Sequence, residues 1–300
     1  MDGTGTRAHL RGMVIAALAA ATLTACSSGG GGGPQARQTT AATPQQVFAA
    51  PKNLLGAAPP QPNGTLWALA GNTASKGLFS ISLATGKGTG SISVSNAAQS
   101  VTESLSGIVG LALGTGQTGA LELLNGSTGK LIRIIPLGAP ARDVVVGSDG
   151  ATFYVLNGNA KSASVTVVNS RSGDLQGTIP VPLSTVSVAP DATGSSLYAL
   201  QPNGLVSQIA VAAGTIMTNF SVGSAGRSLA VSPDGGTLYV LKGAAAAVDN
   251  VAEVNLATES VQRVLPAPAN SMQVLVSADG SRLYQLVGTP AYGNIQVFAS

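Results

Sequence analysis

The chain is poor in the residues on which many enzyme sites depend. Its 300 residues include one cysteine, Cys26, and one histidine, His9. A single cysteine excludes an intrachain disulfide. A single histidine near the N-terminus excludes a Ser-His-Asp triad and a multi-histidine zinc or iron site in the rest of the chain. We therefore predict no catalytic residue, no metal ligand and no cofactor, and an enzymatic role is not favoured.

Charge is also scarce. Only 9% of the residues are charged, and the formal net charge is +3. Once Asp2, Arg7 and Arg11 leave with the leader described next, 13 basic and 11 acidic residues remain, a net charge of +2. So weak an excess does not indicate a nucleic-acid partner.

The N-terminal segment has the pattern of an export signal. Arg7 and Arg11 precede an apolar run over residues 13–23, which is shorter than the roughly 20 residues that cross a bilayer. This pattern is typical of a signal peptide over residues 1–25. The run ends in Leu23-Thr24-Ala25-Cys26, which resembles the lipobox of bacterial lipoproteins. The resemblance implies acylation of Cys26 and a lipid-anchored chain on the extracytoplasmic side of the cell membrane; the alternative is an ordinary secretory leader with an incidental cysteine.

Residues 26–45 follow as a segment of Ser, Gly, Pro, Gln, Thr and Ala, with consecutive glycines over residues 29–33. Such a composition cannot bury enough apolar surface to offset its conformational entropy. We predict a flexible tether with a root-mean-square reach of roughly 25 Å, followed by one folded domain over residues 46–300.

A repeat runs through that domain. Short apolar runs recur with second residues spaced by 44, 43, 44, 41 and 45 positions. These residues are Trp67, Leu111, Tyr154, Tyr198, Tyr239 and Tyr284. Turns of small and polar residues recur with nearly the same period, beginning at Ser82, Asn125, Asn169, Ala210 and Asn255. Two markers that share one period indicate a repeated supersecondary unit.

One copy of the repeat contains four strand-like segments. In the fifth copy, a turn over residues 232–236 separates apolar runs over 228–231 and 237–241, and two further runs cover 251–255 and 261–265. Pro233 and Gly235 supply the backbone geometry of the turn. Four short strands every 40 to 45 residues is the period of a β-propeller blade.

The motif Val231-Ser232-Pro233-Asp234-Gly235-Gly236-Thr237-Leu238-Tyr239-Val240 resembles the YVTN-type propeller repeat, which is found in the lactonase-like propeller superfamily. Six copies favour six blades, and seven would need about 40 more residues. The last copy, residues 272–300, holds only three strands. We predict that residues 46–50 supply the fourth strand and close the ring, which removes an exposed sheet edge.

Charges separate between the two faces of the predicted propeller. The loops that precede the innermost strands, together with those that join second to third strands, carry an excess of basic residues, and we call this side the basic face. Arg142 and Arg227 occupy equivalent positions on it, seven residues before Asp149 and Asp234. We predict that the basic face binds an anionic ligand or partner, and the alternative is a solvated loop surface. The candidate residues are Lys52, Arg142, Lys161, Arg227 and Lys242.

Two other recurring residue types are predicted to be structural. Aspartates recur in the turns after the innermost strands, where Asp accepts hydrogen bonds from backbone amides, and we prefer this role to a ring of metal ligands. They are Asp149, Asp191, Asp234 and Asp279. The aromatic residues that recur in five of the six copies are predicted to pack between blades rather than to stack on a sugar. They are Trp67, Tyr154, Tyr198, Tyr239 and Tyr284.

These patterns together predict a lipid-anchored, extracytoplasmic β-propeller that acts as a non-enzymatic binding or scaffold module. Its partners would be the membrane, through the anchor, and an envelope protein, a glycan or a small anionic ligand. Two enzymatic alternatives stay open: a lactonase-like hydrolase that uses carboxylates and a metal, and a propeller with a quinone cofactor.

Replacing the acylated sulfur tests the anchor. The Cys26→Ser chain is expected to lose incorporation of a palmitate analogue and to move from the membrane fraction to the soluble fraction, because no acyl chain remains to partition into the bilayer. Ser27→Ala is the matched control and should stay with the membrane. Acylation of the Cys26→Ser chain would contradict the prediction.

Overall fold

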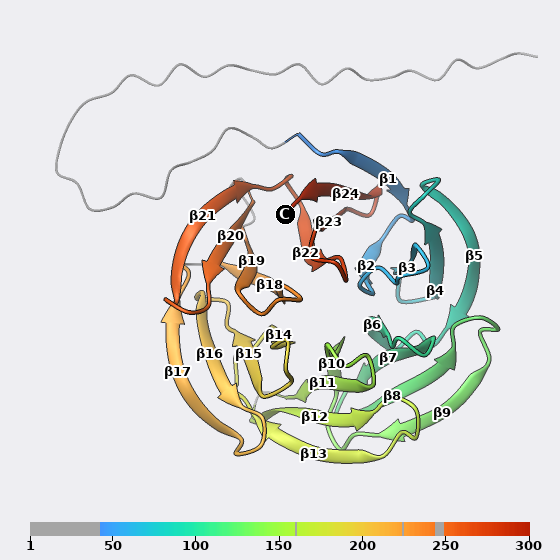
Figure 1. Ribbon diagram of the computed structural model, residues 1–300. Helices are drawn as coiled ribbons and strands as arrows, with labels where there is room; N and C mark the ends of the chain where they lie inside the picture. Colours follow the sequence, from blue (N-terminus) through green and yellow to red (C-terminus); the bar gives the residue numbers. More distant parts are fainter. Residues whose placement is uncertain (1–42, 160, 224, 244–248) are drawn as a thin grey trace, which may run out of the picture. The chain divides into compact units, whose positions relative to one another are not determined.

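The computed structural model describes residues 43–159, 161–223, 225–243 and 249–300. These residues form 24 strands in six four-stranded antiparallel sheets. Figure 1 shows the sheets arranged around a common axis, as the blades of a β-propeller. The all-β class and the six blades are therefore confirmed. The leader, Cys26 and most of the tether lie outside the described residues, within which no helix has the length and hydropathy to cross a membrane.

Each blade is built from consecutive strands, the last one excepted. Blade 1 contains β2 (Leu54–Ala57), β3 (Thr65–Gly71), β4 (Lys76–Ser82) and β5 (Lys87–Val94). Blade 2 contains β6 (Ala98–Glu103), β7 (Ile108–Thr115), β8 (Thr118–Asn125) and β9 (Leu131–Pro136). Blade 3 contains β10 (Ala141–Val146), β11 (Thr152–Gly158), β12 (Ala163–Asn169) and β13 (Leu175–Pro180). Blade 4 contains β14 (Ser187–Pro190), β15 (Ser196–Leu200), β16 (Leu205–Ala210) and β17 (Thr215–Ser221). Blade 5 contains β18 (Gly226–Val231), β19 (Thr237–Lys242), β20 (Asn250–Asn255) and β21 (Ser260–Pro266). Blade 6 contains β22 (Ser271–Val276), β23 (Arg282–Gly288), β24 (Gly293–Ala299) and, from the other end of the chain, β1 (Gln46–Ala50).

The ring closes through the pairing of β1 with β24. The two strands are antiparallel, and Phe48 is the partner of Ile295 in their register. Phe48 is 7% exposed and belongs to a core cluster that also contains Leu66 and Tyr284. The prediction that residues 46–50 complete the last blade is confirmed.

The core lies between the blades. Six apolar clusters are formed by the described residues, and each draws its side chains from two neighbouring blades. The second strand of a blade is buried on both faces, as the buried run from Phe153 to Gly158 in β11 shows. A sheet that is apolar on both faces is stable only when neighbours cover both, so the ring arrangement follows from the strand sequences.

In blade 2 the residue at the position of the recurring aromatic side chain differs from the one that the sequence repeat predicts. In blade 3 the innermost-strand residue Val145 pairs with Tyr154. The equivalent residue of blade 2, two positions after the same register shift, is Thr102, and it pairs with Gly110. Gly110, and not Leu111, therefore holds the place of the aromatic residue, so the alignment of Leu111 with the aromatic residues was wrong. The vacant volume is taken by Phe153 of the next blade, whose ring would lie 3.1 Å from a Cβ at Gly110.

The closing strand offers a test of ring closure. Phe48→Ala removes a buried ring and is expected to lower the free energy of unfolding by about 3 kcal/mol. Val47→Ala, a neighbouring substitution at a side chain that is 55% exposed, should change it by less than about 0.5 kcal/mol. Urea unfolding followed by circular dichroism measures both. Equal effects of the two substitutions would show that β1 does not bury Phe48 in the ring.

Candidate functional site

A cavity of about 740 Å³ follows the propeller axis. Its wall is formed by residues of the innermost strand of every blade, namely β2, β6, β10, β14, β18 and β22, which surround the centre of the ring in Figure 1. A concave volume of this size is suited to a small molecule or to a few side chains of a partner. The cavity is therefore the candidate site.

A β-bulge near the start of the innermost strand shapes one mouth of the cavity. In blade 3 the register shifts between Ala141 and Asp143, which leaves Arg142 outside the ladder. Corresponding shifts occur in blades 1, 2, 5 and 6, and in blade 4 the equivalent Val186 precedes β14. Bulges re-aim side chains, and these six residues all line the cavity. We call them the lip: Leu55, Gln99, Arg142, Val186, Arg227 and Met272.

The next residue of each strand forms a second ring, which we call the collar. Its members are Gly56, Ser100, Asp143, Ser187, Ser228 and Gln273, and all of them line the cavity. Collar side chains make hydrogen bonds to the following blade. The Leu229 amide donates to Ser187 Oγ, and the Val274 amide donates to Ser228 Oγ, both at 3.3 Å.

The collar closes between blades 6 and 1 through a longer side chain. Gln273 Oε1 accepts a hydrogen bond from the Ala57 amide at 2.8 Å, and Gln273 Nε2 donates to the Ala57 carbonyl at 3.2 Å. The neighbouring collar residue is Gly56, where an added Cβ would lie 3.4 Å from Gln273 Oε1. The missing side chain in blade 1 thus leaves room for the amide of blade 6.

Asp143 is the charged member of the collar. Its Oδ1 accepts hydrogen bonds from Ser100 Oγ at 2.7 Å and from the Val144 amide at 2.9 Å. Burial raises the pKa of Asp143, and these two hydrogen bonds oppose the rise. Its place in the cavity depends on the bulge, which the sequence did not show.

On blades 3 and 5 the wall beyond the collar is apolar. Val145 and Val146 of β10 and Ala230 and Val231 of β18 line the cavity and are half-buried. We call these four residues the apolar tier. Together with the lip and the collar they form one continuous cavity wall, whose polarity changes along the axis.

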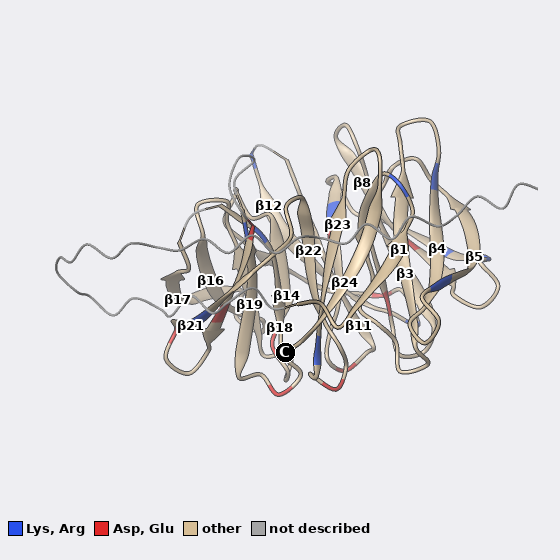
Figure 2. Cartoon of the chain, turned by 90° about the horizontal axis from the view of Figure 1, so that it is seen from above, with Lys and Arg blue, Asp and Glu red and all other residues tan. Residues whose placement is uncertain are grey.

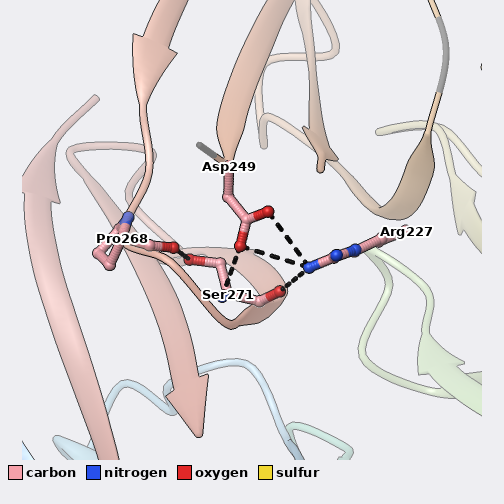
Figure 3. Close-up of polar contacts among 4 residues, drawn as sticks. All are labelled: Arg227, Asp249, Pro268 and Ser271. Atoms are coloured by element: carbon pink, nitrogen blue, oxygen red, sulfur yellow. Dashed lines mark hydrogen bonds and ion pairs between the residues drawn. The ribbon is translucent and has the colours of Figure 1, made fainter. Parts of the chain in front are cut away.

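Arg227, one of the two arginines predicted to bind an anion, is engaged within the protein. Its Nη1 lies 3.3 Å from Asp249 Oδ1 and donates to the Ser271 carbonyl at 3.0 Å, as Figure 3 shows. Asp249 Oδ2 also accepts from the Ser271 amide at 2.9 Å, and Ser271 Oγ donates to the Pro268 carbonyl at 2.7 Å. The network ties blade 5 to blade 6, and the buried Asp249 carboxylate neutralises the guanidinium.

Arg142 differs from Arg227 because its blade lacks that carboxylate. The strand pairings place Ala163 of blade 3 at the position of Asp249 in blade 5. Arg142 is exposed, and its guanidinium makes no hydrogen bond or ion pair with the described residues. Of the two arginines that the sequence made equivalent, Arg142 is the one available to a ligand.

The three predicted lysines lie on the basic face but do not line the cavity. Lys52 and Lys161 are exposed in the loops before β2 and between β11 and β12. Lys242 Nζ donates to the Val222 carbonyl at 2.6 Å, and burial lowers the pKa of Lys242. In the side view of Figure 2, acidic positions mark turns along the lower edge, where basic positions also occur, and further basic positions lie toward the upper edge.

Glu103 is a cavity-lining residue that the sequence analysis did not select. Its side chain is buried, and its Oε2 has no hydrogen-bond partner among the described residues. Burial raises the pKa of Glu103 to about 7, and a hydrogen bond with the Trp67 side chain opposes this rise. The equivalent residues of four other blades are apolar or proline, namely Val146, Pro190, Val231 and Val276. A carboxylate at this repeat position is the signal that could have revealed it.

Three of the four turn aspartates, Asp149, Asp234 and Asp279, accept hydrogen bonds from backbone amides as predicted. Among the described residues, the Asp191 side chain accepts only from the Thr193 and Ser195 hydroxyls. Asp149 Oδ1 accepts from the amides of Ala151 and Thr152 at 2.9 and 3.0 Å. Asp279 accepts from Ser277 Oγ and from the amide and hydroxyl of Ser281, and these hydrogen bonds lower the pKa of Asp279 to about 2. Within the described residues, no group of three or more His, Cys, Asp and Glu side chains is placed to hold a metal ion.

Comparison with known proteins adds support for the fold. No family model and no curated protein matches the chain. Among solved structures, the chain is similar to hydrazine synthase of Kuenenia stuttgartiensis, with a TM-score of 0.62 and 17% sequence identity over 78% of this chain and 73% of that one. This likeness shows the fold alone.

Glu103 predicts a specific dependence of stability on pH. Because its pKa rises from an ordinary value of 4.5 to about 7 in the folded chain, ionisation opposes folding. Its contribution to stability is complete below pH 4.5 and is lost as the pH rises through 7. Glu103→Gln should remove this loss and flatten the profile, by about 2 kcal/mol after allowance for solvent screening of a partly hydrated group.

Urea unfolding between pH 4.5 and 8 measures the difference between the wild-type chain and the variant. Asp279→Asn is the control, since the low pKa of Asp279 keeps that carboxylate ionised throughout this range. Parallel profiles for the wild-type chain and Glu103→Gln would contradict the buried placement of the carboxyl group.

Proposed function

We propose that the chain is a lipid-anchored, extracytoplasmic binding module without enzymatic activity, which takes an anionic ligand, or an anionic group of an envelope protein or glycan, at Arg142. The observation that carries the proposal is the exposed Arg142 guanidinium on the lip of a cavity of about 740 Å³. A guanidinium presents several N–H donors in a planar fork, which matches the oxygens of carboxylates and phosphates.

The location in the proposal is supported by the N-terminal sequence. Leu23-Thr24-Ala25-Cys26 resembles a lipobox, and the two chains of a diacylglycerol supply the two membrane signals that stable anchoring requires. The first strand, β1, begins at Gln46, so residues 26–45 lie between the membrane anchor and the propeller.

We also propose that the propeller belongs to the YVTN-type, lactonase-like group, because of the motif over residues 231–240.

Substitution of Arg142 tests the proposed function. The Cys26→Ser chain, intended to carry no acyl group and to need no detergent, is titrated with citrate and with inorganic phosphate by calorimetry. At least one of these anions is expected to bind, and Arg142→Gln should weaken binding about tenfold, the effect of losing a charge-assisted hydrogen bond. Lys130→Gln, in the turn between β8 and β9 on the side opposite the basic face, should leave the affinity unchanged.

A second variant separates the charge of Arg142 from its side-chain volume. Ala163→Asp places a carboxylate where Asp249 lies in blade 5, so it should neutralise Arg142 and weaken anion binding while Arg142 itself is intact. Circular dichroism verifies that this variant folds. Unchanged affinity in folded Arg142→Gln would refute the proposal.

A further inference from the structure

The three levels of the cavity differ in what they offer a ligand. At the lip, Arg142 is exposed, and Leu55 and Val186 are 37% and 39% exposed. The collar below contains Asp143. Farther along the axis the wall is formed by the half-buried side chains of the apolar tier and, on the side of blade 2, by Thr102 and the Glu103 carboxyl group. A ligand that matches this wall must change polarity along its own length.

Electrostatics places the anionic end of such a ligand at the lip. Arg227 is already paired with Asp249, so it contributes little additional attraction. An anion that moved from Arg142 toward the collar would approach Asp143, which in its ionised form repels an anion more strongly where water is partly excluded. The anionic group is therefore held at Arg142 and kept out of the collar.

The deeper levels favour an apolar body. Ser187, Ser228 and Gln273 use their side chains in hydrogen bonds to neighbouring blades, which reduces what the collar offers to a polar ligand. Contact with Val145, Val146, Ala230 and Val231 would remove apolar surface from water on both partners, a favourable change roughly proportional to the area covered.

We infer that the cavity binds a small amphipathic organic anion, an alkyl chain ending in a carboxylate, with the carboxylate at Arg142 and the chain along the apolar tier. The inference rests on the proposed function, since it uses the same anion site, and it adds the apolar body of the ligand. An alkyl phosphate shares this chemistry, so octyl phosphate serves as a second probe.

Octanoate is the test probe. Acetate, which keeps the carboxylate but lacks the long alkyl chain, and octanol, which keeps the chain but lacks the charge, are the controls. Each is titrated into the Cys26→Ser chain by calorimetry. Octanoate should bind at least about tenfold more tightly than acetate, the effect of burying roughly two methylene groups. It should also bind at least about tenfold more tightly than octanol, which lacks the charge that Arg142 recognises. Octyl phosphate should behave as octanoate does.

Two substitutions locate the ends of the probe. Ala230→Leu narrows the apolar tier and should weaken octanoate at least about fivefold while leaving citrate and phosphate binding unchanged. Ala257→Leu, an identical substitution at an exposed turn of the same blade, should have no effect. Asp143→Asn preserves the acceptor for Ser100 and removes the like charge, so it should tighten octanoate binding about threefold.

The outcomes separate the inference from the proposed function. If citrate or phosphate binding depends on Arg142 but octanoate binds no more tightly than acetate, the proposed function stands and the amphipathic ligand is wrong. If Ala230→Leu leaves octanoate binding unchanged in a folded chain, or Asp143→Asn weakens it, the placement of the alkyl chain is overturned. If Arg142→Gln changes the binding of no anion, both fail.

Discussion

The structure depends on the fact that each blade has two apolar faces. No blade can shield both by itself, so each sheet is stable only between two neighbours. The six interblade clusters meet this requirement, and each contains side chains of two adjacent blades. A linear stack would leave its two end blades uncovered, whereas a closed ring has no ends. The cavity is a result of the same closure, because the innermost strands surround the axis.

This constraint explains why the sequence predicts the fold well. The packing requirement repeats every 41 to 45 residues, so strands, turns and blade number are visible as a period. The sequence does not show the register within one copy, because Gly110 replaces an aromatic residue and Phe153 of another blade fills the space. That compensation joins residues 43 positions apart and leaves no local pattern.

The candidate site could be predicted only in part. Charge counting selected Arg142 and Arg227 together, since both precede a turn aspartate by seven residues. Their environments differ because of Ala163 and Asp249, residues on other strands whose equivalence appears only in the pairing. Glu103 was missed for a related reason. A carboxylate in a sequence is read as a surface charge until its neighbours are known.

The separation of its two strands in the sequence gives the closing pair a particular place in folding. Phe48 and Ile295 are partners that lie 247 residues apart, so the pair can form only when both ends of the propeller are available. Pairings of such long sequence separation form slowly. Until β1 and β24 pair, blades 1 and 6 each keep an uncovered apolar face, and a chain with an open ring is exposed to aggregation and proteolysis.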